Sequence, residues 1–122
     1  MASIALQRVY DVRAPFSPHT FLTDRLWPRG IAKARLDGVN WLKEVAPSTA
    51  LRQAFHHAHL DWPAFVARYR DELAANPRAW QPLVQLLRQG ESLTLLYGSR
   101  DSQCNQAVAL RDWLLAQLSA GE

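Results

Sequence analysis

The residues best suited to chemistry lie in one short segment, residues 24–33, which reads Asp-Arg-Leu-Trp-Pro-Arg-Gly-Ile-Ala-Lys. Three cations, Arg25, Arg29 and Lys33, are grouped around the Trp27-Pro28 pair. Guanidinium groups bind carboxylate and phosphate oxygens through paired hydrogen bonds, whereas the packing of a core needs no such cluster. The segment therefore predicts a site for an anionic ligand that carries phosphate or carboxylate.

Two other interpretations of this segment stay open at the level of sequence. In the first, Asp24 and Asp37 neutralise the three cations in surface ion pairs, which are common and contribute little stability. In the second, Trp27-Pro28 forms a rigid turn whose indole covers the edge of the core. The second interpretation is compatible with a ligand site at the same place.

Two further groups of reactive side chains are weaker candidates. His56, His57 and His59 precede Asp61, but their spacing is not that of a known zinc site, and we expect no metal there. Cys104 comes just before an expected helix, where a thiolate is stabilised, so it is a candidate nucleophile. The isolated glycines do not form a dinucleotide-binding fingerprint, and the sequence identifies no cofactor.

Strands must position the cationic segment. Residues 3–10 predict a first strand, and residues 21–26 predict a second, which Trp27-Pro28 ends because proline lacks an N–H donor. Residues 93–97 are a compact apolar run, typical of a buried and parallel strand. Ligands of open parallel sheets bind beyond the carboxyl ends of the strands. The loops after Leu26 and Tyr97 are therefore expected to meet.

That meeting would bring the cationic segment close to Arg100, Asp101 and the amino terminus of the last helix, whose N–H groups favour an anion.

Helical patterns fill most of the remaining chain. The pattern turns helical from Trp41, and Ser48 is placed to cap a short helix that ends in the histidines. Asp61 caps a second helix, a third ends near Gly90, and a fourth follows residues 99–102. The sequence thus predicts an α/β layer fold, a single domain over residues 1–122 with a short, mostly parallel sheet flanked by helices.

Composition limits the classes of function. The chain has 122 residues, of which 48% are hydrophobic, and its formal net charge is +3. No apolar stretch approaches the roughly 20 residues that span a bilayer, so no membrane partner is expected. The modest charge, without a basic tail, does not require nucleic acid. A lone cysteine, Cys104, fits a reducing compartment, and we expect the cytoplasm.

Several motifs together are specific to a known family. They are Arg8-Val9-Tyr10-Asp11, residues 24–33, residues 41–48, Leu51-Arg52, Arg68-Tyr69, Leu95-Leu96-Tyr97 and Asn105-Gln106-Ala107. With these motifs the chain resembles the YeaO-like family of small bacterial proteins, which carries the domain of unknown function 488. The resemblance implies a single Rossmann-like three-layer α/β domain and supplies no established reaction.

The family pattern can be transferred position by position. The matching positions are Asp24, Arg25, Trp27, Pro28, Arg29, Gly30, Lys33, Trp41, Lys43, Glu44, Pro47, Ser48, His57, Asp101 and Asn105. Two places depart from the pattern. Ala58-His59 stands where members have Asp-Pro, and Cys104 stands where members more often have His or another polar residue.

These observations lead to a first hypothesis, a cytosolic protein that binds an anionic small molecule such as a nucleotide, with catalysis left open. The candidate ligand-binding residues are Arg25, Trp27, Arg29, Lys33, Lys43, Ser48, Arg100 and Asn105. The side chains available for proton transfer or orientation are Asp24, Glu44 and Asp101.

The alternative hypothesis is a regulatory module that binds nucleic acid or protein through an exposed patch of Arg25, Trp27 and Arg29. A purely structural role remains as a third possibility if internal ion pairs bury those arginines.

Overall fold

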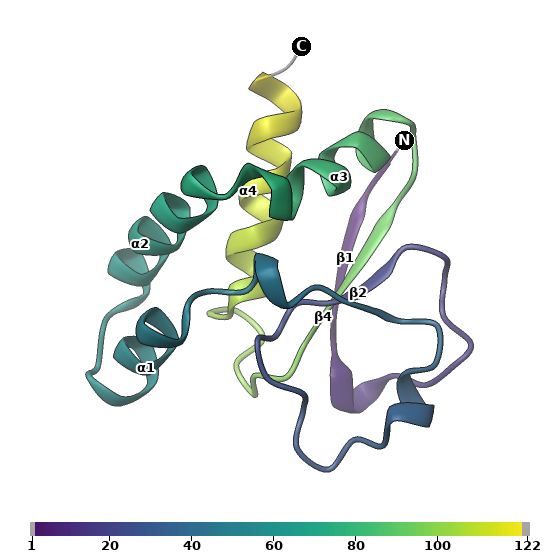
Figure 1. The fold of residues 1–122 in the computed structure, drawn as a ribbon, viewed down its shortest axis with the longest axis horizontal. Helices are drawn as coiled ribbons and strands as arrows, with labels where there is room; N and C mark the ends of the chain where they lie inside the picture. Colours follow the sequence, from purple (N-terminus) through teal and green to yellow (C-terminus); the bar gives the residue numbers. More distant parts are fainter. Residues whose placement is uncertain (1, 121–122) are drawn as a thin grey trace.

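The most apolar strand, β4 (Leu93–Tyr97), lies inside a four-stranded parallel sheet. The computed structural model describes residues 2–120. The other strands are β1 (Ile4–Arg8), β2 (Thr20–Leu22) and β3 (Asn40–Trp41), and the order across the sheet is β1-β4-β2-β3. All pairs are parallel, so the four carboxyl ends share one edge of the sheet, at the lower end of the molecule in Figure 1.

Four α-helices share one core with this sheet (Figure 1). They are α1 (Thr49–His57), α2 (Trp62–Ala75), α3 (Pro77–Arg88) and α4 (Gln106–Ala120). Helices α3 and α4 make the main contacts with the strands, and α1 and α2 pack beside them. Successive strand residues point to opposite faces, so Leu93, Leu95 and Tyr97 of β4 enter the core that all four helices share. Burial of these apolar side chains fixes the helical layer to the sheet.

Loops and 3-10 turns cover the opposite face. Leu96 and Leu22 point there and pack with Val9, Ile31 and Leu36. The turns are η1 (Val9–Asp11) and η2 (Lys33–Leu36), while a third turn, η3 (Lys43–Val45), leads into the helices. The segment between β2 and β3, which contains the predicted cationic site, is therefore held by a small core of its own.

The α/β fold with a short parallel sheet and flanking helices is confirmed, but three element boundaries differ from the prediction. The strand predicted over residues 3–10 ends at Arg8, and the strand predicted over residues 21–26 covers only Thr20–Leu22. Beyond Leu22, the Thr23 N–H still donates to the carbonyl of Leu96 (3.1 Å), and the chain then leaves the sheet.

The third difference concerns Trp41, where the sequence pattern turns helical. Asn40 and Trp41 instead pair with Phe21 and Leu22 as strand β3. Pairing with a neighbouring strand overrides the local preference, as is common for short segments.

The predicted helix caps are confirmed. The hydroxyl of Ser48 accepts the N–H of Leu51 (3.1 Å) at the start of α1, and the carboxylate of Asp61 accepts the N–H of Ala64 (2.9 Å) at the start of α2. Both interactions satisfy N–H groups that lack partners in the first helical turn. None of the helices in the described part of the chain is long and apolar enough to cross a membrane.

Candidate functional site

A cavity of about 330 Å³ lies beyond the carboxyl ends of the strands. The loop after β2 lines it from Asp24 to Arg29, and the loop after β4 contributes Gly98 and Ser99. The remaining lining residues are Tyr10, Pro47, Arg52, Phe55, His56, Phe65, Cys104, Asn105 and Gln106. The predicted meeting of the two loops is confirmed.

Asp24 is the carboxylate of this cavity. Its side chain accepts hydrogen bonds from the amide of Gln106, on α4, and from the backbone N–H of Gly98. Burial raises the pKa of Asp24 from its ordinary value of 3.8 to about 6, because water no longer stabilises the charged form. The bonds from Gln106 and Gly98 and the charge of Arg52 lower the pKa and offset part of this effect.

The Asp24 carboxylate lies close against Gly98. A Cβ atom at position 98 would lie 2.6 Å from Oδ2 of Asp24, which is closer than real Cβ contacts. Glycine therefore serves here to bring two chain segments together. The loop after β2 and the loop after β4 are joined at this point.

Arg25 and Trp27 line the cavity but have structural partners. The Arg25 guanidinium donates to the carbonyls of Pro47 (2.9 Å) and Ala46 (3.1 Å). The Trp27 indole donates to the carbonyl of Ile31 (2.7 Å) and packs edge-on against Trp41. The rigid turn predicted for Trp27-Pro28 is thus present, and it forms a wall of the cavity.

Arg29 is the exposed cation of the cavity rim. Its backbone carbonyl accepts a hydrogen bond from the hydroxyl of Tyr10 (2.8 Å), while its side chain has no such internal bond within residues 2–120. Arg8 stacks over the Tyr10 ring at 4.7 Å and donates to the carbonyl of Ser99 (3.1 Å). Residues at the end of β1 therefore hold both cavity loops in place.

One face of α1 supplies a second group of lining residues, none of which was predicted to bind a ligand. Arg52, Phe55 and His56 lie three and four positions apart, a spacing that places side chains on one helical face. The pKa of His56 is lowered by burial and by the nearby charge of Arg52, which favours the neutral imidazole. The periodicity was visible in the sequence, but only the packing shows that this face borders the cavity.

The start of α4 forms another wall. Asn105 is buried, and its side chain donates to the carbonyl of Asp101 (2.8 Å) and accepts the N–H of Val108 (3.1 Å). Asn105 thus acts as a cap in the cavity wall. Cys104 also lines the cavity and is half-buried.

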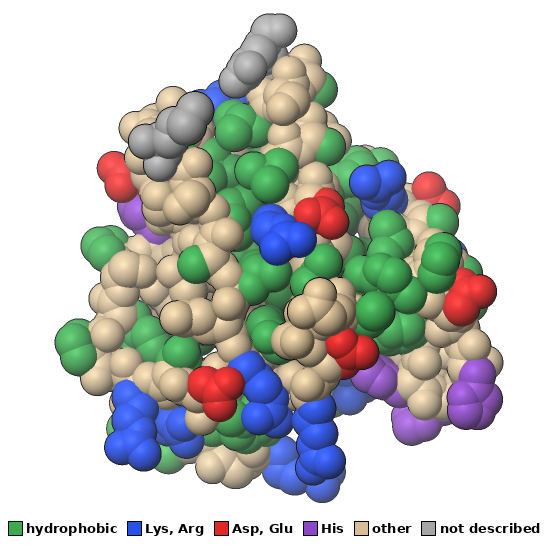
Figure 2. Space-filling view, turned by 180° about the vertical axis from the view of Figure 1, so that it is seen from behind, with side chains coloured by type: hydrophobic (Ala, Val, Ile, Leu, Met, Phe, Trp, Pro, Cys, Tyr) green, Lys and Arg blue, Asp and Glu red, His purple; other side chains and the backbone are tan. Residues whose placement is uncertain are grey.

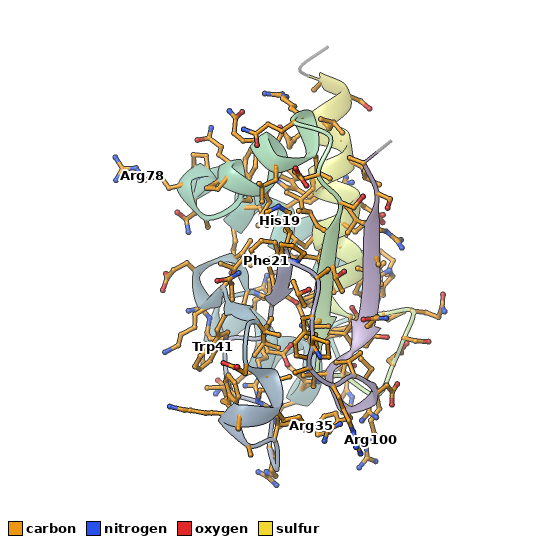
Figure 3. The ribbon with its side chains drawn as sticks, turned by 90° about the vertical axis from the view of Figure 1, so that its right-hand side faces the viewer. His19, Phe21, Arg35, Trp41, Arg78 and Arg100 are labelled. Atoms are coloured by element: carbon orange, nitrogen blue, oxygen red, sulfur yellow. The ribbon has the colours of Figure 1, made fainter. Side chains whose placement is uncertain are left out.

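Six predicted site residues do not line this cavity: Lys33, Lys43, Glu44, Ser48, Arg100 and Asp101. Lys33 and Arg100 are exposed on the loops beyond it, and Figure 3 shows Arg100 extending outward from the lower end of the molecule. The Asp101 carboxylate accepts the N–H groups of Gln103 and Cys104, which lowers the pKa of Asp101.

The segment before α1 has structural contacts instead. Lys43 lies over the Trp41 ring at 4.3 Å, and Ser48 is bonded to the Glu72 carboxylate through its N–H and its hydroxyl. Glu44 borders a separate cavity of about 80 Å³, which Arg25 also lines. Pro47 lines the larger cavity, but the side chains of its neighbours in the sequence do not reach into it.

Ion pairs do not neutralise the cationic segment. Within residues 2–120 the ion pairs are His19 with Glu91 (3.6 Å) and Arg111 with Asp112 (3.1 Å). The interpretation in which Asp24 and Asp37 pair with Arg25, Arg29 and Lys33 therefore fails for the part of the chain that the structure describes. In the same part, no three His, Cys, Asp or Glu side chains are grouped to hold a metal ion.

The sequence matches the family described as the inactive DUF488-N3 subclade over residues 3–122. The chain belongs to this family. It is 40% identical to an uncharacterized protein, YeaO, of Escherichia coli over 112 residues, which are 92% of this chain and 96% of the relative. It is also 39% identical over 70 residues to uncharacterized proteins of Mycobacterium bovis and Mycobacterium tuberculosis, covering 57% of this chain and 59% of each relative.

These matches confirm the resemblance to the YeaO-like family. No solved structure matches the chain.

The junction between Asp24 and Gly98 can be tested by a double-mutant cycle. We expect Gly98→Ala to lower the free energy of unfolding by about 1–3 kcal/mol, because the new methyl group collides with Oδ2 of Asp24. In an Asp24→Ala background the same substitution should cost less, since the colliding atom is gone. Urea denaturation of the four proteins measures this coupling, and equal costs in both backgrounds would contradict the contact.

The raised pKa of Asp24 predicts a pH dependence of stability. Between pH 4 and 6 the folded state keeps a proton on Asp24 that the unfolded chain has released. This tighter proton binding stabilises the folded state, and the stabilisation is complete below about pH 4 and is lost as pH rises toward 6. The loss amounts to about 3 kcal/mol for a shift of this size.

Asp24→Asn should remove this slope, whereas the exposed carboxylate variant Asp37→Asn should retain it. The free energies of unfolding of the three proteins, measured by urea denaturation from pH 4 to 7, give the comparison. Parallel curves for the original chain and Asp24→Asn would show that Asp24 is not the group responsible.

Proposed function

We propose that this protein binds a small anionic molecule, such as a nucleotide or another ligand with phosphate or carboxylate, in the cavity beyond the strand ends. The observation that carries the proposal is the exposed Arg29 at a cavity that Arg25 and Arg52 also line. The lining thus contains three arginines and one acidic residue, Asp24. A cavity of about 330 Å³ is within the size range of small-molecule sites.

We propose binding without chemical turnover. The family to which the chain belongs is described as an inactive subclade. Of the three acidic side chains considered for proton transfer, Asp24 lines the cavity, whereas Glu44 and Asp101 lie outside it. We also propose that the protein binds its ligand in the cytoplasm, since the lone Cys104 fits a reducing compartment.

One observation favours the alternative of a polyanion such as nucleic acid. Figure 2 shows Lys and Arg side chains gathered at the lower end of the molecule, where the exposed Arg100 also lies (Figure 3). Stacking on bases through Trp27 is not supported, because the indole is engaged by Ile31 and Trp41. The small-molecule proposal is therefore preferred.

Removal of the Arg29 guanidinium tests the proposal. Its side chain makes no internal hydrogen bond in residues 2–120, so Arg29→Ala should retain the stability of the unliganded fold. Thermal unfolding with inorganic phosphate, nucleotides and sugar phosphates should show stabilisation of the original chain that is reduced in the variant. A loss of one charge-assisted hydrogen bond corresponds to about tenfold weaker binding.

Arg78→Ala is the matched control, because Arg78 is exposed and lies at the opposite end of the molecule from Arg100 in Figure 3. We expect it to keep the full ligand-induced shift. No shift with any of these compounds would contradict the proposal. Binding of an oligonucleotide that falls steeply with salt, in the absence of small-molecule binding, would support the polyanion alternative instead.

A further inference from the structure

The side chains of the cavity differ in depth and in chemistry. Asp24 is withdrawn from water, as its raised pKa reflects, whereas Arg29 is exposed at the rim. An anionic group placed against Asp24 would be repelled by the carboxylate once it is ionised. The anion of a ligand is therefore better placed near the rim, and a different part of the ligand must meet Asp24.

Asp24 retains the capacity to accept hydrogen bonds. An ionised carboxylate has about four acceptor sites on its two oxygens. Gln106 and the N–H of Gly98 account for two donors in this structure. A ligand that presents N–H groups to Asp24 would use the remaining sites, while Gln106 and Gly98 hold the carboxylate in position.

The lining of the same cavity includes apolar side chains that a phosphate or a sugar would leave uncovered. Phe55 is stacked on the buried Phe65, with ring centroids 4.4 Å apart and planes inclined by 28°. Leu26 also lines the cavity and is 57% exposed, which is unusual for a large apolar side chain. A flat ring packed against these side chains would remove apolar surface from water.

We propose that the ligand carries, besides its anionic group, a planar heteroaromatic ring whose N–H donors bind Asp24 and whose face packs against Phe55 and Leu26. The anionic group then lies toward Arg29. The ligand class is an anion with a lactam or amidine edge, of which a purine nucleotide is one example. This inference rests on the proposed function, because it concerns the same cavity.

Three related probes separate the contributions of ring and anion. GMP has both parts, ribose 5-phosphate lacks the ring, and guanosine lacks the phosphate. Isothermal titration at pH 7.5, where Asp24 is mainly ionised, should show that GMP binds at least about tenfold more tightly than ribose 5-phosphate. Guanosine should also bind more weakly than GMP, because it lacks the group that Arg29 binds.

Two variants assign this preference to the side chains. Asp24→Asn should reduce the ratio of GMP to ribose 5-phosphate affinity to near one, whereas Asp37→Asn, an exposed carboxylate outside the cavity, should leave the ratio unchanged. Phe55→Leu keeps an apolar side chain but removes the aromatic face, and it should lower the same ratio without weakening ribose 5-phosphate. This second variant tests the inference even if Asp24→Asn does not fold.

The outcomes distinguish this inference from the proposed function. Equal binding of GMP and ribose 5-phosphate by the original chain would overturn the planar ring while leaving the anion site in place. A preference for GMP that survives both Asp24→Asn and Phe55→Leu would overturn the assignment to these side chains. Failure of all three probes and of inorganic phosphate to bind would overturn the proposed function, and this inference with it.

Discussion

The parallel pairing of β2 with β4 is the constraint on which the candidate site depends. The register places Leu22 beside Leu96, and the Thr23 N–H extends the pairing by one more bond to Leu96. When the register is continued, Asp24 falls opposite Gly98. The two segments thus leave the sheet at the same level. There the carboxylate of Asp24 lies against Gly98, which has no side chain.

This junction explains how a charged group is kept in a partly buried place. An isolated carboxylate removed from water is strongly disfavoured, and proteins compensate with hydrogen bonds or opposite charges. Asp24 has both, from Gln106 and Gly98 and from the charge of Arg52, yet its pKa remains about 6. Its charge can therefore change near neutral pH. The other cavity residues are positioned by contacts of their own, such as those of Tyr10 with Arg29 and of Arg8 with Ser99.

Much of this architecture could be predicted from local patterns. The apolar run at residues 93–97 gave the buried strand, and the Ser48 and Asp61 caps marked two helix starts. The rule that parallel strands gather their carboxyl ends then predicted the meeting of the two loops. This prediction is confirmed because β2 and β4 are neighbours in the sheet.

The remaining errors have a common physical origin, which is that side-chain direction depends on tertiary packing. Ser48 and Lys43 are close in sequence to cavity residues, yet their side chains contact Glu72 and Trp41. Arg52 was overlooked because helical spacing defines a face without saying what that face borders. Likewise, only the packing of Trp27 against Trp41 shows that its indole is a fixed wall.

A crystal structure of the protein soaked with tungstate, an anomalous scatterer of similar charge to phosphate, would show directly whether the cavity binds an anion. We expect an anomalous peak inside the cavity, with the guanidinium groups of Arg29 and Arg52 as its nearest cations. Peaks confined to exposed residues outside the cavity, such as Lys33 and Arg100, would contradict this expectation.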